Sequence, residues 1–161
     1  MVWVIIPKLY HILIGPWSNY KWSLDNKGVV LGNLENYTGA ILYFDKALAM
    51  DPQYLDALAN KGAVLNSLGN HTEAIEYFDR ALAIEPKHEN ALYNKGLALD
   101  NLGNHTGAIL YYDRALAIEP NNVDTLNSKG LALNSLGNYT GAILYYDKAL
   151  AINPHYDLAL K

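Results

Sequence analysis

The chain has 161 residues, of which 51% are hydrophobic and 17% charged, so it has enough apolar side chains to bury a core and is not expected to be disordered. Its net charge of −4 provides no basic field to attract the phosphate backbone of a nucleic acid. It has no cysteine for disulfides or thiolate chemistry, which fits a cytoplasmic protein.

Residues 1–20 form an apolar N-terminal segment that begins MVWVIIPKLYHILI. The apolar run is shorter than the ~18 residues that a membrane span requires, and Pro7, Lys8 and His11 interrupt it. A secretory signal carries its positive charge before the apolar run, whereas Lys8 lies inside this one. Three interpretations stay open. Residues 7–14 form a degenerate second helix of a half-repeat that caps the chain, or the segment is a disordered or self-associating tail, or it is a targeting signal.

A 34-residue period begins at residue 21. Glycine, Ala-Leu pairs and proline all recur at this step, at Gly28, Gly62, Gly96 and Gly130, at Ala47, Ala81, Ala115 and Ala149, and at Pro52, Pro86, Pro120 and Pro154. We therefore predict four repeats, over residues 21–54, 55–88, 89–122 and 123–156, and the start of a fifth at 157–161, where Leu160 takes the place of earlier leucines. A period of this length is typical of solenoids.

Each repeat contains two segments with helical spacing of apolar residues. In the third repeat the first segment has Leu92, Gly96, Leu99 and Leu102 on one face, which we expect to pack on the second segment. Asn104 is the expected N-cap of the second helix, and Asn70 with Glu73 has the spacing of a capping box. The sequence thus predicts an all-α solenoid of antiparallel helix pairs.

These repeats resemble the tetratricopeptide repeat. The resemblance rests on the Gly and Pro positions, the small residues, and an aromatic position at Phe44, Phe78, Tyr112 and Tyr146. It implies a right-handed superhelix whose first helices line a concave groove that holds peptides. Where the family often has Trp and Tyr in the first helix, this chain has leucines, at Leu24, Leu58, Leu92 and Leu126 and at Leu31, Leu65, Leu99 and Leu133.

A second face of each first helix begins two residues before the packing face, about 200° around the helix. We call it the groove stripe; it comprises residues 22, 25, 26 and 29 and their equivalents at each 34-residue step. The candidate groove residues are Trp22, Asp25, Asn26, Asp56, Asn60, Asn90, Tyr93, Asn94, Asp124 and Asn127. An asparagine amide both donates and accepts, so the ladder of Asn26, Asn60 and Asn94 could bind the backbone of an extended peptide. Alternatively, these asparagines only solvate an exposed helix face.

Aspartates give the predicted groove an acidic character: Asp25, Asp56, Asp100 and Asp124. The groove stripe contains no Lys or Arg, which a binder of C-terminal carboxylates would need. The positions that form such a clamp in chaperone-binding members of the family hold Asp25, Val29, Asn60, Asn90 and Asn94 here. We therefore expect a neutral or basic peptide or protein segment as the partner, and not a chaperone tail.

A lysine column lies next to the groove stripe: Lys27, Lys61, Lys95 and Lys129. We expect the lysine stems to pack between repeats with their ammonium groups reaching solvent, although a basic rim is an alternative. The acid–base pairs of the second helices, beginning with Asp45-Lys46, are expected to form a solvated convex face.

The sequence gives little support for glycosylation, nucleotide binding, catalysis or metal binding. Four N-x-T sequons at Asn36, Asn70, Asn104 and Asn138 are one turn repeated, where asparagine already serves as a helix cap. The glycine-rich turns lack the Gly-Lys-Ser/Thr of a nucleotide-binding loop. Because the polar residues recur with the period, we predict no enzyme, no cofactor and no metal site.

The function that we predict is a non-catalytic scaffold for protein–protein interaction, which binds a peptide or protein segment in the groove. We do not expect nucleic acid or a membrane as a partner. Two alternatives stay open. The chain is a self-assembling structural module that associates through uncapped ends, or it is a fragment of a longer array.

Overall fold

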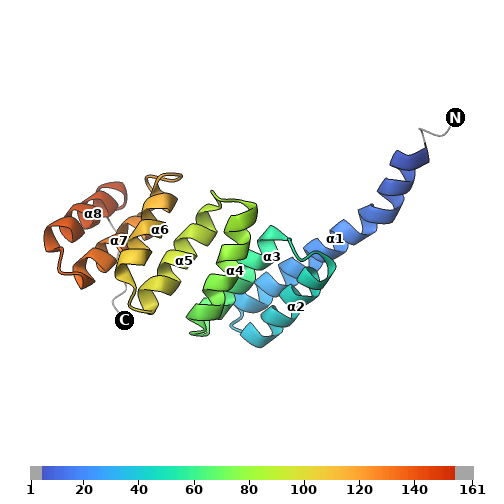
Figure 1. Cartoon of the computed structure of the whole chain (residues 1–161), viewed down its shortest axis with the longest axis horizontal. Coiled ribbons are helices and arrows are strands. Elements are labelled where there is room, and N and C mark those ends of the chain that lie inside the picture. The colour runs from blue at the N-terminus through green and yellow to red at the C-terminus, as the bar shows by residue number, and fades with distance from the viewer. Residues whose placement is uncertain (1–4, 155–161) are drawn as a thin grey trace.

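The computed structural model describes the backbone of residues 5–154 and the side chains of residues 19–154. This part of the chain contains eight helices: α1 (Ile5–Asn33), α2 (Tyr37–Met50), α3 (Leu55–Ser67), α4 (His71–Ile84), α5 (Glu89–Asn101), α6 (His105–Leu116), α7 (Val123–Ser135) and α8 (Tyr139–Ile152). Figure 1 shows them as successive pairs in one elongated stack. The predicted all-α solenoid is confirmed, whereas the predicted start of a fifth repeat lies outside the described residues.

Glycine and an aromatic ring form the contact inside each helix pair. The rings of Phe44, Phe78 and Tyr112 are fully buried. A Cβ atom added to Gly96 would lie 2.5 Å from Cε1 of Tyr112, and Gly62 stands in the same relation to Phe78. The period of 34 therefore keeps glycine in the first helix and a ring in the second because the ring occupies the space that any other side chain on the first helix would need.

The turns between paired helices explain the recurring asparagine. Asn104 caps α6, and its side chain accepts a hydrogen bond from the Gly107 backbone N–H; Asn36 and Asn138 cap α2 and α8 in the same way. A Cβ at Gly107 would approach the Asn104 amide to 2.7 Å, so glycine leaves room for the cap. Asn70 stands at the N-cap of α4 but its side chain makes no capping bond, so the capping box predicted with Glu73 is not formed.

Helix α1 differs from the predicted organisation of the N-terminus. We expected a separate helix over residues 7–14, but residues 5–33 form one continuous helix without a turn. The other links between repeats contain a turn proline, and the equivalent position one period before Pro52 is Ser18. In Figure 1 the N-terminal part of α1 extends away from the other helices. The proposed capping of the array by residues 1–20 stays a prediction.

One residue of the predicted packing face lies outside the core. Leu92 is buried under the second helix, but Leu102 is 51% exposed. Leu102 is the C-cap of α5, so it follows the last helical turn and its side chain leaves the packed face. Within residues 5–154 no helix has the length and hydropathy to cross a membrane.

Candidate functional site: the surface of the first helices

The first helix of each pair faces the inner side of the stack. Helix α1 contacts α3, α3 contacts α5, and α5 contacts α7. Within residues 5–154, the second helices α2, α4, α6 and α8 make no such contacts with one another. Elements on the inside of a curve lie closer together than those on the outside, so the groove stripe lies on the inner side.

Two hollows adjoin along the inner surface. One lies between α1 and α3, and its lining includes Val29, Asn60 and Ala63. The other lies between α3 and α5 and is lined by Asp56, Ala59, Asn60, Ala63, His88, Asn90 and Asn94. Asn60 therefore lines both hollows and stands at the centre of the candidate site.

The Asn60 amide pairs with a buried carboxylate of the preceding repeat. Its Nδ2 donates to Oδ1 and Oδ2 of Asp25 at 3.1 and 3.3 Å. Asp25 is only 5% exposed, and burial raises the pKa of its carboxyl group, an effect that the Asn60 hydrogen bond opposes and the nearby Asp56 carboxylate reinforces. The three residues thus form a polar cluster across the boundary between the first and second repeats.

Asn26 and Asn94 have a different arrangement from Asn60. The Nδ2 of Asn26 donates to the backbone carbonyl of Trp22, and the Nδ2 of Asn94 donates to that of Asn90, both at 2.8 Å. Each amide therefore bonds to its own helix one turn back, with its oxygen and second N–H left for other partners. The asparagine ladder is present in register, but its members are held in two different ways.

Tyr93 occupies the inner surface between α5 and α7. Its hydroxyl lies 3.5 Å from Oγ of Ser128, and its ring centroid lies 6.2 Å from that of Tyr112. Burial raises the pKa of the Tyr93 hydroxyl, while the Ser128 hydrogen bond opposes the rise. An aromatic side chain thus bridges the repeats where the ladder is broken by Ser128.

The predicted groove residues divide into three classes of exposure. Trp22, Asp56, Asn90 and Asp124 are exposed, Asn26, Asn60, Tyr93 and Asn94 are half-buried, and Asp25 and Asn127 are buried. Asp25 and Asn127 occupy the same position in their repeats as Tyr93, which points along the array toward the next first helix. Neither side chain is accessible to a ligand in this conformation. We therefore exclude Asp25 and Asn127 from the contact residues that we propose.

Asp100 also does not belong to the groove. Its Oδ1 lies 2.6 Å from Nδ1 of His105, at the turn between α5 and α6. The acidic character of the inner surface therefore comes from Asp25, Asp56 and Asp124. Among the side chains of residues 19–154, no cluster of three or more His, Cys, Asp or Glu is arranged to hold a metal ion.

Comparison with known proteins identifies the repeat. The family model of the tetratricopeptide repeat matches residues 26–89, 85–123 and 93–157. The chain belongs to the tetratricopeptide repeat family.

Solved structures of tetratricopeptide proteins are similar over most of the chain. A crystal structure of MamA is 26% identical, with a TM-score of 0.78 over 90% of this chain and 85% of that one. MamA from Desulfovibrio magneticus RS-1, residue 41 to the end, is 25% identical, with a TM-score of 0.77 over 85% of this chain and 77% of that one.

The first tetratricopeptide domain of Spaghetti (RPAP3), bound to the HSP90 peptide SRMEEVD, shares the fold. It is 24% identical, with a TM-score of 0.71 over 73% of this chain and 93% of that one. A search of curated proteins found no match.

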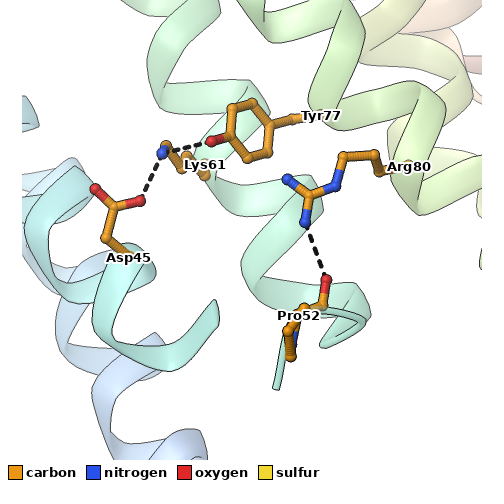
Figure 2. A network of polar contacts seen from close by, with 5 residues as sticks. All are labelled: Asp45, Pro52, Lys61, Tyr77 and Arg80. Atoms are coloured by element: carbon orange, nitrogen blue, oxygen red, sulfur yellow. Dashed lines mark hydrogen bonds and ion pairs between the residues drawn. The ribbon is translucent and has the colours of Figure 1, made fainter. Parts of the chain in front are cut away.

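The tetratricopeptide repeats are joined by a polar network that the sequence analysis missed (Figure 2). Nζ of Lys61 donates to Oδ1 of Asp45 in the preceding repeat at 2.5 Å and to the Tyr77 hydroxyl at 2.7 Å. Arg80 stacks on the Tyr77 ring, 5.2 Å from its centroid, and donates to the Pro52 carbonyl at 3.0 Å. This network ties the second repeat to the first through four side chains and one backbone carbonyl.

The lysine, aspartate and tyrosine of this network recur at the next two boundaries. Lys95 donates to Asp79 and Tyr111, and Lys129 donates to Asp113 and Tyr145. The predicted packing of the lysines between repeats is confirmed at Lys61, Lys95 and Lys129, each 6% exposed. The prediction that their ammonium groups reach solvent was wrong, because each is bound by a carboxylate and a phenol. The constant spacing of 16 residues from Asp to Lys to Tyr was the signal in the sequence.

Proposed function

We propose that this tetratricopeptide chain is a non-catalytic interaction scaffold that binds an extended peptide or protein segment along the groove stripe. The observation that carries the proposal is the position of Asn60 in two adjoining hollows, with Asn26 and Asn94 one repeat away on either side. We place the scaffold in the cytoplasm, since its sequence has no cysteine that would benefit from an oxidising compartment.

The amide groups have the chemistry to read a peptide backbone. Within residues 19–154, the side-chain oxygens of Asn26, Asn60 and Asn94 accept no hydrogen bond. Each oxygen is therefore available to a backbone N–H of a guest, and this pairing does not depend on the guest's sequence. Trp22, which is 61% exposed, and the half-buried Tyr93 offer aromatic surface to the guest's side chains.

The charge of the inner surface favours a neutral or basic guest. Asp56 and Asp124 are exposed beside the asparagines, and the groove stripe has no basic residue. The similar domain of Spaghetti (RPAP3) binds an acidic HSP90 peptide, SRMEEVD, so the architecture is compatible with a bound peptide. We propose the opposite charge preference for this chain because acidic guests would meet carboxylates and no cation.

Selection from a random-peptide phage library tests the proposal. We expect the protein to enrich peptides with Lys or Arg and few acidic residues, and the variant Asn26→Ala/Asn94→Ala to bind the selected peptides at least about tenfold more weakly, as for the loss of two hydrogen bonds. The two asparagines bond only to their own helices, so the melting temperature should change little.

A matched variant separates groove binding from a general effect of asparagine loss. Asn70→Ala/Asn121→Ala removes two exposed asparagines from turns, where neither side chain makes a hydrogen bond within residues 19–154. This variant should retain the selected peptides. Equal loss in both variants, or selection of acidic peptides, would refute the proposal.

A further inference from the structure

The interfaces between repeats have two complementary faces. The leading face belongs to the first helix of the later repeat and is formed by Ala57, Lys61 and Val64 in α3. These three positions are buried in the second, third and fourth repeats: Ala57, Lys61 and Val64; Ala91, Lys95 and Ala98; Thr125, Lys129 and Ala132. Three successive boundaries thus share one design, with a central lysine between small or apolar neighbours.

The trailing face belongs to the second helix of the earlier repeat. In α2 it is formed by Ile41, Asp45 and Leu48, and Asp45 binds the lysine of the next repeat. Leu48 and its equivalent Leu82 are buried. At each internal boundary, the trailing face thus contributes a carboxylate flanked by aliphatic side chains. The leading face contributes a lysine surrounded by small or apolar residues.

The first repeat presents the leading face to solvent. Ser23, Lys27 and Val30 occupy the three positions in α1, and all are exposed, Val30 at 56%. Lys27 already has part of the internal network, because its Nζ lies 4.5 Å from the centroid of the Tyr43 ring and its charge lowers the pKa of the Tyr43 hydroxyl. The carboxylate that completes the network elsewhere is missing among residues 19–154.

The fourth repeat presents the trailing face to solvent. Ile143, Asp147 and Leu150 occupy the three positions in α8; Ile143 is 59% exposed and Leu150 is 47% exposed. Asp147 is exposed and makes no hydrogen bond or ion pair within residues 19–154. The described part of the chain thus carries both halves of its own internal interface on opposite ends of the stack.

We propose that a second copy of this chain docks head to tail on these faces, with Asp147 of one copy bound to Lys27 of the next. The contact would reproduce the Asp113–Lys129–Tyr145 arrangement as Asp147–Lys27–Tyr43, with Ile143 and Leu150 covered by the leading face. Since the two faces differ and lie at opposite ends, the contact is heterologous and leaves a free face on each end of a dimer for a further copy. The proposal is independent of what the groove binds.

Charge reversal at each end tests the proposed contact. For the wild type, sedimentation equilibrium at low salt should show a weight-average mass that rises with concentration past that of a dimer. Lys27→Asp or Asp147→Lys should each lower the association constant at least about tenfold, because like charges would face each other in a covered interface. Both positions are exposed, so thermal melting should confirm that the variants remain folded.

Mixing the variants distinguishes the proposed register from any other mode of association. An equimolar mixture of Lys27→Asp and Asp147→Lys places opposite charges at every contact and should restore assembly, as should the double variant Lys27→Asp/Asp147→Lys. The control Glu76→Lys/Lys87→Asp, at exposed positions away from both faces, should assemble like the wild type. A wild type that stays monomeric, or reversed pairs that fail to restore assembly, would overturn the proposal.

Discussion

Two surfaces of the same first helices behave differently along the array. The lysine column makes the same contacts at three successive boundaries, with an aspartate from the preceding repeat and a tyrosine from its own. The groove stripe does not repeat in this way. Asn60 binds the carboxylate of Asp25, whereas Asn26 and Asn94 each bind a carbonyl of their own helix. In the fourth repeat, Ser128 lies within hydrogen-bond distance of the Tyr93 hydroxyl.

The difference separates what the fold requires from what it leaves open. Every repeat must pack on the previous one, so a single solution at the interface serves all boundaries. The inner surface is only partly covered, and packing does not fix its residues. We therefore expect the variable residues of the groove stripe to determine which ligand binds. We expect the uniform lysine column to determine the stability of the stack.

Removal of a buried lysine should have the largest effect and sharpen this comparison. Lys61→Ala, Lys95→Ala and Lys129→Ala should each lower the free energy of unfolding by about 3 kcal/mol, because each leaves a carboxylate without its partner and a cavity where the stem packed. Urea unfolding monitored by circular dichroism measures the loss.

The matched control lies in the same column. Lys27 is exposed and has no carboxylate partner among residues 19–154, so Lys27→Ala should change the free energy of unfolding by less than about 0.5 kcal/mol. Equal losses at Lys27 and Lys61 would break the link between the network and stability.

Substitution of the paired glycine should follow in size. In Gly96→Ala the new methyl group would lie 2.5 Å from the Tyr112 ring, and we expect a loss of about 2 kcal/mol despite the better helix propensity of alanine. In the background of Tyr112→Leu the same change should cost less, because the obstructing ring is gone. Thermal unfolding of the four proteins measures the coupling, and additive losses would contradict the ring contact.

The Tyr112 hydroxyl offers a gain in stability. It is buried and has no hydrogen-bond partner among the described residues, whereas the first two repeats have Phe44 and Phe78 at this position. Tyr112→Phe should therefore raise the free energy of unfolding by about 1 kcal/mol, since it removes an unsatisfied polar group without a change of shape. Tyr146→Phe, at a half-buried ring, should be close to neutral. A loss of stability in Tyr112→Phe would show that the hydroxyl is satisfied in solution.

The smallest effect concerns the acidic cluster at the groove. The pKa of the Asp25 carboxyl group is raised above 3.8 in the folded protein. Above the folded pKa the buried carboxylate is charged and lowers the free energy of unfolding. As the pH falls through the folded pKa toward 3.8, the folded protein takes up a proton that the unfolded chain does not bind, so this loss of stability disappears. Asp25→Asn should be more stable than the wild type at pH 7, by less than about 1 kcal/mol, and the difference should shrink toward pH 4.

Asp51 provides the opposite case for the same titration. The hydrogen bond from Lys21 lowers the pKa of the Asp51 carboxyl, so its stabilisation is present above 3.8 and is lost as the pH falls through the folded pKa. Unfolding of Asp51→Asn should therefore show a deficit at pH 7 that disappears in acid. An Asp25→Asn variant with the same profile as Asp51→Asn would contradict the assignment of Asp25 as a buried, destabilised carboxylate.

The sequence was sufficient for the helix pairs but not for the partners between repeats. Helical periodicity and the period of 34 predicted the face of the first helices that packs on the second helices, the asparagine caps and the face that carries Asn60. They could not predict that Asn60 would bind Asp25, because periodicity reports the face of a residue and not the offset between neighbouring first helices. The same limit applies to Lys61: the packing of its stem between repeats was predicted correctly, but its carboxylate partner depends on how two repeats stack.

The N-terminal helix shows a second limit. The shift by one period suggested a separate helix over residues 7–14, whereas α1 runs without interruption from Ile5 to Asn33. A weak match to the repeat does not reveal whether the intervening turn has been lost.

The N-cap of α4 shows the same limit of sequence comparison. Asn70 keeps the N-cap position of the other repeats, but its side chain does not form the capping hydrogen bond.

The side-chain amide signals of asparagine in a ¹⁵N NMR spectrum test the central claim most directly. Two pools of synthetic decapeptides serve as probes, one with lysine and one with glutamate at fixed alternate positions and otherwise equal mixtures. If the inner surface binds a basic or neutral segment, the lysine pool shifts the signals of Asn26, Asn60 and Asn94 and leaves those of Asn70 and Asn121 in place, while the glutamate pool has no effect. Shifts confined to the turn asparagines, or equal shifts with both pools, would contradict the account.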